Sequence, residues 1–167
     1  MLAKTRIATI TPCLWFDTQA EQAARLYTSV FPNSRIDAVS RYGKAAGAAL
    51  GLEPGSVLAV SFALDGQPFT AFNAGPAYRF NEAVSFQVQC DSQDEIDRYW
   101  EGLGVGGDAS ACQCGWLKDR FGLSWQVVPR LLAAWTTEDP VRAERVMQAL
   151  LPMKKLDLAA LRRAYEC

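Results

Sequence analysis

The sequence predicts an α+β fold in which one arrangement of strands and a helix occurs twice and is followed by C-terminal helices. Three observations indicate this fold: a repeated order of strand and helix patterns, a motif that recurs 74 residues further along the chain, and strands with alternating apolar residues. With 167 residues, half of them hydrophobic, the chain can bury a core without disulfides or metals.

The first half begins with a strand pattern from Ile7 to Phe16, which leads into a helix start at Asp17–Thr18. Apolar residues then recur at helical spacing from Ala20 to Phe31, and Pro32 ends the pattern. Asp65–Gly66 predicts a hairpin turn. Three further strands are expected, at Arg35–Tyr42, Ser56–Leu64 and Pro68–Asn73.

The second half repeats this order. Ala83–Cys90 has a strand pattern, and Asp91–Ser92 begins a helix whose apolar face consists of Ile96, Tyr99, Trp100 and Leu103. After a glycine-rich stretch, two short strands are expected near Gln113–Lys118 and Leu123–Pro129. Two helices should follow, one led by Thr137–Pro140 and running to about Leu151, and one capped by Asp157 and running towards Tyr165.

A motif of the form D-[ST]-Q-x-E begins at Asp17 and again at Asp91. Taken alone, each copy is explained by a capping box at a helix start. Together with the matching element order, the two copies favour an internal duplication. We therefore expect a first module at residues 1–80, a second at 81–130, and a helical extension at 131–167.

Strand alternation predicts one apolar and one polar face in each sheet. Val84, Phe86 and Val88 should lie opposite Ser85, Gln87 and Gln89. Leu14 and Phe16 should likewise lie opposite Cys13 and Trp15, and Trp125 and Val127 opposite Ser124, Gln126 and Val128. The polar faces fit a concave sheet around a partly wet pocket, and an ordinary half-exposed antiparallel sheet is the alternative.

Composition excludes several classes of function. The net charge of −1 gives no electrostatic basis for binding nucleic acid or an anionic membrane. The chain has no histidine, which excludes histidine-dependent metal sites and Ser-His or Cys-His nucleophile pairs. Five cysteines, an odd number, and an N-terminus without an apolar run of signal-peptide length predict a reduced, cytoplasmic protein without membrane spans.

Four segments carry a resemblance to a known family. Pro12–Phe16, Asn81–Phe86, Gln113–Pro129 and Met153–Asp157 are similar to the PhnB-like family, often labelled demethylubiquinone methyltransferase-like. That family belongs to the vicinal oxygen chelate (glyoxalase, bleomycin-resistance and dioxygenase) superfamily. The resemblance implies two tandem βαβββ modules that form a cup-shaped mixed sheet, and it implies a homodimer. It implies no particular activity.

The resemblance also locates the positions at which the wider superfamily holds a metal. These positions correspond to Thr11, Ser85, Gln126 and a residue within Phe69–Asn73. Hydroxyls and amides are weak ligands for zinc, nickel or iron, so we expect neither metal nor cofactor. A methyltransferase is not expected either. The stretch Gly102–Gly107 matches G-x-G-x-x-G but follows a helix, where a nucleotide-binding loop must precede one.

We therefore expect a small molecule in a metal-free pocket, as in the metal-free bleomycin-resistance branch of the superfamily. A metal-independent enzyme that uses Cys114, or that holds an anionic substrate with Arg79, is the second hypothesis. The third is an interaction protein whose helical tail from Val141 to Tyr165 binds a partner chain. The expected ligand-binding residues are Thr11, Trp15, Asn73, Ser85, Gln87, Cys114, Trp116 and Gln126.

Overall fold

The computed structural model describes residues 10–167, so the predicted start of the first strand at Ile7 lies outside the described residues. The chain divides into two compact units, with the boundary between Arg79 and Phe80. The C-terminal helices belong to the second unit. A boundary at residue 130 between a second module and a separate extension stays a proposal.

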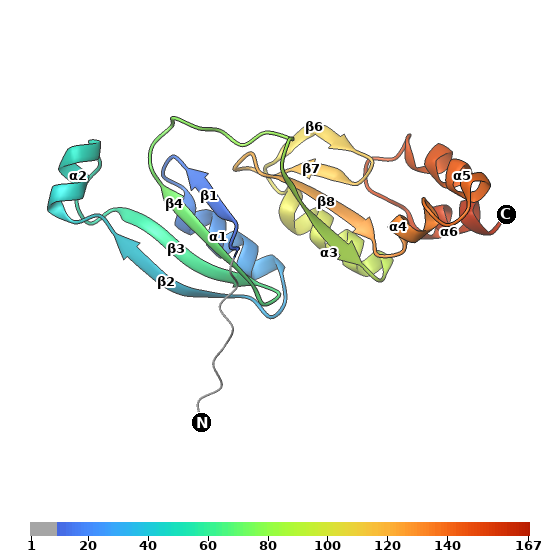
Figure 1. The fold of residues 1–167 in the computed structure, drawn as a ribbon, viewed down its shortest axis with the longest axis horizontal. Helices are drawn as coiled ribbons and strands as arrows, with labels where there is room; N and C mark the ends of the chain where they lie inside the picture. The colour runs from blue at the N-terminus through green and yellow to red at the C-terminus, as the bar shows by residue number, and fades with distance from the viewer. Residues whose placement is uncertain (1–9) are drawn as a thin grey trace, which may run out of the picture. The chain divides into compact units, whose positions relative to one another are not determined.

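The first unit contains a four-stranded mixed sheet in the order β1-β4-β3-β2. β1 is parallel to β4, and the other neighbours are antiparallel. Figure 1 shows α1 packed along this sheet. The elements are β1 Cys13–Phe16, α1 Ala20–Val30, β2 Arg35–Arg41, α2 Lys44–Leu50, β3 Val57–Leu64 and β4 Gln67–Asn73.

The second unit repeats this topology, with the strand order β5-β8-β7-β6 and a parallel β5–β8 pair. Each strand takes the place of its counterpart in the first sheet, which confirms the predicted duplication and the α+β fold. The elements are β5 Ser85–Cys90, α3 Gln93–Gly104, β6 Asp108–Gln113, β7 Trp116–Lys118, β8 Ser124–Pro129, α4 Leu132–Trp135, α5 Pro140–Leu150 and α6 Leu158–Glu166.

One expected strand begins later than predicted. The strand expected near Gln113–Lys118 is β7, which begins at Trp116, and the residues before it form a hairpin corner in which β6 ends at Gln113. Cys114 and Gly115 both have positive φ, 52° and 84°, as a two-residue hairpin turn requires. β6 itself was missed because its residues, Asp108 to Gln113, are mostly small or polar and lie at the sheet edge.

Two short helices, α2 and α4, were also missed. α2 follows β2 and contains four alanines, and its described side chains are largely exposed. Its sequence therefore lacks the apolar stripe that signals a helix by periodicity. α4 is only four residues long and buries Trp135. The helix that ends near Gly104 and the loop before β6 agree with the interpretation of Gly102–Gly107 as a helix end.

The two modules begin their helices in different ways. In the second module Ser92 accepts a hydrogen bond from the Glu95 amide at 3.2 Å, and Glu95 accepts one from the Asp91 amide at 2.7 Å, so the predicted capping box is confirmed. In the first module no side chain at the N-cap Gln19 caps α1. The Asn73 side chain of β4 accepts from the Ala20 amide at 2.8 Å instead.

Each helix buries its predicted apolar face. α1 buries Ala20, Ala23, Ala24 and Tyr27, and the small side chains of the three alanines let the helix lie close to the sheet. α3 buries Ile96, Tyr99 and Leu103, while Trp100 is only partly buried. The apolar faces of β5 and β8 supply Phe86, Cys90, Trp125 and Val127 on the helix side, as alternation predicts.

The C-terminal helices form a core of their own with the last strand. Val128 of β8 packs in one apolar cluster with Trp135, Val146, Leu150, Leu156 and Leu161. The helices gather at the end of the second sheet where β8 finishes (Figure 1). The predicted cap of α6 is confirmed, because Asp157 accepts from the Ala160 amide. Within the predicted leading segment Thr137–Pro140 of α5, the cap is Asp139, which accepts from the Val141 and Arg142 amides.

Candidate functional site

The polar face of the second sheet contains four of the eight predicted ligand-binding residues. In the parallel pair, Ser85 lies beside Ser124 and Gln87 beside Gln126. In the antiparallel pair, Trp116 lies beside Gln126. Ser85, Gln87, Trp116 and Gln126 therefore occupy neighbouring positions on three strands. We call Ser85, Gln87, Trp116, Lys118, Ser124 and Gln126 the polar face.

The Gln126 side chain connects two of these residues. Its Nε2 donates to Ser85 Oγ at 2.8 Å, and its Oε1 accepts from Gln87 Nε2 at 3.4 Å. Both Gln126 and Ser85 are partly exposed, and Gln87 is exposed. Ser85, Gln87 and Gln126 therefore offer amide and hydroxyl groups that are held in place by hydrogen bonds and are accessible to a ligand, with the Trp116 ring beside them. Such a set can hydrogen-bond and stack with a small molecule.

A charged pair lies one row further along the polar face. Lys118 is the direct cross-strand neighbour of Ser124, and its ammonium forms an ion pair with Glu82. The hydrogen bond from Lys118 holds the pKa of the Glu82 carboxyl below its usual range, with further lowering from a backbone hydrogen bond and the Lys118 charge. Ser124 is 1% exposed, and its Oγ is the one buried side-chain N or O atom without a hydrogen-bond partner in residues 10–167.

Strand alternation predicts the correct face for Ser124, but Ser124 was not among the expected ligand-binding residues. Lys118 and Glu82 were not among them either. Alternation in β8 gives Ser124 the same side as Gln126. An unpaired buried hydroxyl, however, is visible only from three-dimensional packing. The Lys118–Glu82 pair joins residues on different segments that no spacing in the sequence connects.

The predicted residues of the first unit have other surroundings. Trp15 is partly buried, donates from Nε1 to the Gly75 carbonyl at 2.8 Å, and contacts Phe72 and Tyr78 edge-to-face at 4.8 and 4.9 Å between ring centroids. Thr11 is exposed and precedes β1. Thr11 and Trp15 thus belong to the first unit, whereas Ser85 and Gln126 belong to the second. A ligand role for Thr11 and Trp15 stays a prediction.

Two expected ligand-binding residues have structural roles. Asn73 is buried on the helix side of β4, and its Nδ2 donates to the Val57 carbonyl at 3.0 Å while its Oδ1 caps α1. Cys114 occupies the β6–β7 turn and packs against the cluster of C-terminal helices. A ligand role for both residues stays a prediction. These contacts were not expected, because neither the register of β4 nor the position of the turn could be fixed from the sequence.

Ser85 and Gln126, two of the positions at which the resemblance implies a metal, do not fit a transition metal. Ser85 and Gln126 are hydrogen-bonded to each other, and a hydroxyl with an amide lacks the anionic or imidazole character that zinc, nickel and iron require. No group of three or more Cys, Asp or Glu residues that could hold an ion occurs within residues 10–167. No helix in the same part of the chain is both long and apolar enough to cross a membrane.

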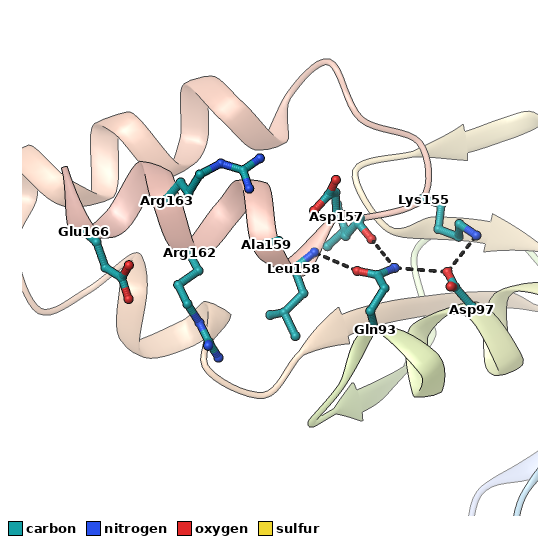
Figure 2. Close-up of a pocket in the computed structure, with 10 residues that line it drawn as sticks. Gln93, Asp97, Lys155, Asp157, Leu158, Ala159, Arg162, Arg163 and Glu166 are labelled. Carbon is teal, nitrogen blue, oxygen red and sulfur yellow. Dashed lines mark hydrogen bonds and ion pairs between the residues drawn. The ribbon is translucent and has the colours of Figure 1, made fainter.

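Two hollows of the second unit were not predicted. One, of about 620 Å³, lies between the start of α3 and α6 and is lined by Gln93, Asp97, Leu158 and Arg162 among others. Figure 2 shows Gln93 between Leu158 and Asp97, with hydrogen bonds to Asp97 and to the Leu158 amide. The other, of about 360 Å³, lies between the end of α3 and β6. The larger of these two hollows was not predicted because it depends on contacts made by the C-terminal helices.

Comparison with known proteins gives the family. A family model described as 3-demethylubiquinone-9 3-methyltransferase matches residues 8–128. A solved structure from Bacillus cereus, described as a 3-demethylubiquinone-9 3-methyltransferase and PhnB protein, is 30% identical over 73% of this chain and 99% of its own, with a TM-score of 0.64. The family match ends before α4, so the C-terminal helices lie outside it.

A more distant structure shares the fold. It is a protein from Pseudomonas aeruginosa that is 21% identical over 72% of this chain and 96% of its own, with a TM-score of 0.55. Weaker similarity extends to the fosfomycin resistance protein FosX from Mesorhizobium loti, which is 15% identical over 72% of this chain and 89% of its own, with a TM-score of 0.49. No curated protein matches. The chain belongs to the PhnB-like family, described as 3-demethylubiquinone-9 3-methyltransferase.

Proposed function

We propose that the protein binds a small organic molecule on the polar face of the second sheet, and that it does so without a metal or other cofactor. The observation that carries this proposal is the hydrogen-bonded row of Ser85, Gln126 and Gln87 beside Trp116. Polar groups at fixed positions give orientation, and an aromatic ring gives contact area. The homodimer and the cytoplasmic location stay predictions.

Two other functions lack support from their own residues. An enzyme based on Cys114 would need a thiolate activated by a base or a cation, but the Cys114 sulfur contacts the Leu151 carbonyl at 3.6 Å and the Gln113 amide at 3.5 Å, and neither group supplies such activation. The alternative enzyme, in which Arg79 holds an anionic substrate, has no contact that fixes the arginine in a site: Arg79 is exposed and forms no ion pair within residues 10–167. An interaction surface on α5 and α6 would need their apolar stripe, which already packs on the chain's own Val128.

The methyltransferase description is not carried over to this chain. A nucleotide-type cofactor loop lies between a strand and the helix that follows it, so that the helix N-terminus meets the phosphates. Here Gly102 and Gly104 end α3, and Gly107 leads into β6. The glycines therefore terminate a helix and form a turn.

The substitution Gln126→Leu tests the proposed binding face. A thermal-shift screen against metabolites and drug-like compounds should yield a ligand that adds about 2.7 kcal/mol of stability at a hundredfold excess over its dissociation constant. The variant should bind this ligand about tenfold more weakly, because an amide that orients the ligand is removed. Its own stability should change by less than about 1 kcal/mol, since Gln126 is partly exposed.

Gln148→Leu is the matched control, because Gln148 is an exposed glutamine on α5 outside the polar face. It should bind the ligand as the unmodified protein does. Equal affinity of the Gln126→Leu variant and the unmodified protein for every ligand found would contradict the proposal.

Elemental analysis tests the metal-free part of the proposal. After dialysis, the purified protein should contain well under one equivalent of zinc, nickel, iron or manganese, because Ser85 and Gln126 supply no strong ligand. A full equivalent that survives dialysis, and that the Gln126→Leu variant loses, would show that these residues do hold a metal.

A further inference from the structure

Ser124 is a buried hydroxyl with no partner in the described part of the chain. Leaving such a group unsatisfied is unfavourable, so buried hydroxyls are almost always hydrogen-bonded. An alanine at this position of β8 would remove the cost. The serine is therefore best explained by a partner that is not part of this chain. Ser124 lies on the same side of β8 as Gln126, on the polar face.

The neighbours of Ser124 on both sides are also hydrogen-bond donors. Ser85 is its parallel cross-strand partner, and Lys118 is its antiparallel partner. The Ser85 oxygen already accepts from Gln126, so its own proton remains available for donation. Directly opposed side chains have Cβ atoms about 4.5–5.5 Å apart. Two hydroxyls and an ammonium thus meet in one row across β5, β8 and β7.

An acidic side chain already pairs with this row. The Glu82 carboxylate forms an ion pair with Lys118, although Glu82 lies in the segment before β5 and its side chain is 59% exposed. An exposed carboxylate on a connecting segment can move away from Lys118 without disturbing the sheet. Asp108, the β6 neighbour of Lys118, instead accepts hydrogen bonds from the amide and hydroxyl of Ser110.

We propose that Lys118, Ser124 and Ser85 form a subsite for an anionic oxygen group of the ligand, a carboxylate or a phosphonate, and that Glu82 competes with this group for Lys118. This inference rests on the proposed binding face and specifies its ligand as an anion. The rest of the ligand extends towards Trp116 and Gln126, which occupy the next row of the same face. Displacement of Glu82 releases the Lys118 ammonium for the ligand, and the ligand oxygens accept from both hydroxyls.

Two probes of equal ring size test the subsite: phenylphosphonate, which is anionic, and benzyl alcohol, which is neutral. Affinities are measured by chemical-shift titration of the labelled full-length protein. Lys118→Met should weaken phenylphosphonate binding about tenfold, and Ser124→Ala about fivefold, because charge-assisted hydrogen bonds are lost. Glu82→Gln should strengthen it severalfold, because a competing charge is removed. The affinity for benzyl alcohol should change less than about twofold in all three variants.

Folding controls separate these effects from damage to the protein. Lys154→Met replaces an exposed lysine of the second unit and should leave both affinities unchanged. Ser124→Ala should melt at the same temperature as the unmodified protein or higher, since it removes an unsatisfied buried hydroxyl. Ser124→Thr keeps the hydroxyl and should bind phenylphosphonate more tightly than Ser124→Ala does.

The outcomes distinguish the subsite from the binding face. If both probes bind in a manner that depends on Gln126 but not on Lys118, Ser124 or Glu82, the anion subsite is wrong and the binding face stands. If Glu82→Gln weakens phenylphosphonate binding, the competition is wrong. If neither probe perturbs Ser85, Trp116 or Gln126, the binding face itself is contradicted.

Discussion

Replacing Asp119 with alanine is expected to lower the free energy of unfolding of the second unit by about 3–5 kcal/mol. Asp119 is 2% exposed at the turn between β7 and β8. Its Oδ1 accepts from the Phe121 and Leu123 amides at 2.8 and 3.1 Å, and its Oδ2 accepts from the buried Trp125 indole at 2.9 Å. The substitution would leave three donors without their acceptor, each at a cost of about 1–3 kcal/mol.

Urea denaturation followed by tryptophan fluorescence measures this loss. Asp119→Asn should have an intermediate effect, because it keeps one oxygen for the two amides but can turn an NH₂ group towards the Trp125 N–H. Asp94→Ala, at an exposed position in the first turn of α3, should lose less than about 1 kcal/mol. Equal losses for Asp119→Ala and Asp94→Ala would show that the turn does not depend on the buried carboxylate.

Replacing Leu161 with alanine is the second substitution expected to have a large effect, with a loss of about 2–5 kcal/mol. Leu161 of α6 is fully buried in the cluster that joins the C-terminal helices to Val128. Removing its side chain leaves a cavity that the surrounding residues fill only in part. A loss of this size means that the helices beyond the family match are part of the folded second unit.

Leu151→Ala provides the comparison, because Leu151 is 54% exposed and lies just beyond α5. The Leu151→Ala variant should lose less than about 1 kcal/mol of unfolding free energy in the same urea experiment. If the two leucine variants unfold alike, or if Leu161→Ala produces a separate early transition of the C-terminal helices, the close packing of the extension on β8 is contradicted.

The sequence was sufficient to predict the architecture because two independent patterns agree. The repeat at Asp17 and Asp91 and the alternation in β5 and β8 both depend on local periodicity, which the strands and helices preserve. Prediction failed at β6, where small polar residues form an edge strand, and at the Cys114–Gly115 turn, whose positive φ at a cysteine no common turn motif indicates.

The candidate site could be predicted only where alternation decides the face. Ser85, Gln87 and Gln126 lie together because β5 and β8 pair in the parallel register, as the duplication requires. Asn73 was named as ligand-binding although the phase of β4 was not fixed, and its burial on the helix side could not be predicted because a shift of one residue reverses the face. Lys118, Glu82 and the unpaired Ser124 hydroxyl depend on contacts between segments distant in sequence, which no single-sequence pattern reports.

Mapping the strongest ligand from the thermal-shift screen by amide and side-chain chemical shifts tests the proposed binding face most directly. The largest shifts should occur at Ser85, Gln87, Trp116 and Gln126. The competing location is the hollow beside the C-terminal helices, which contains Gln93, Leu158 and Arg162 (Figure 2). The largest shifts at those three residues, with the polar face unchanged, would contradict ligand binding at the polar face.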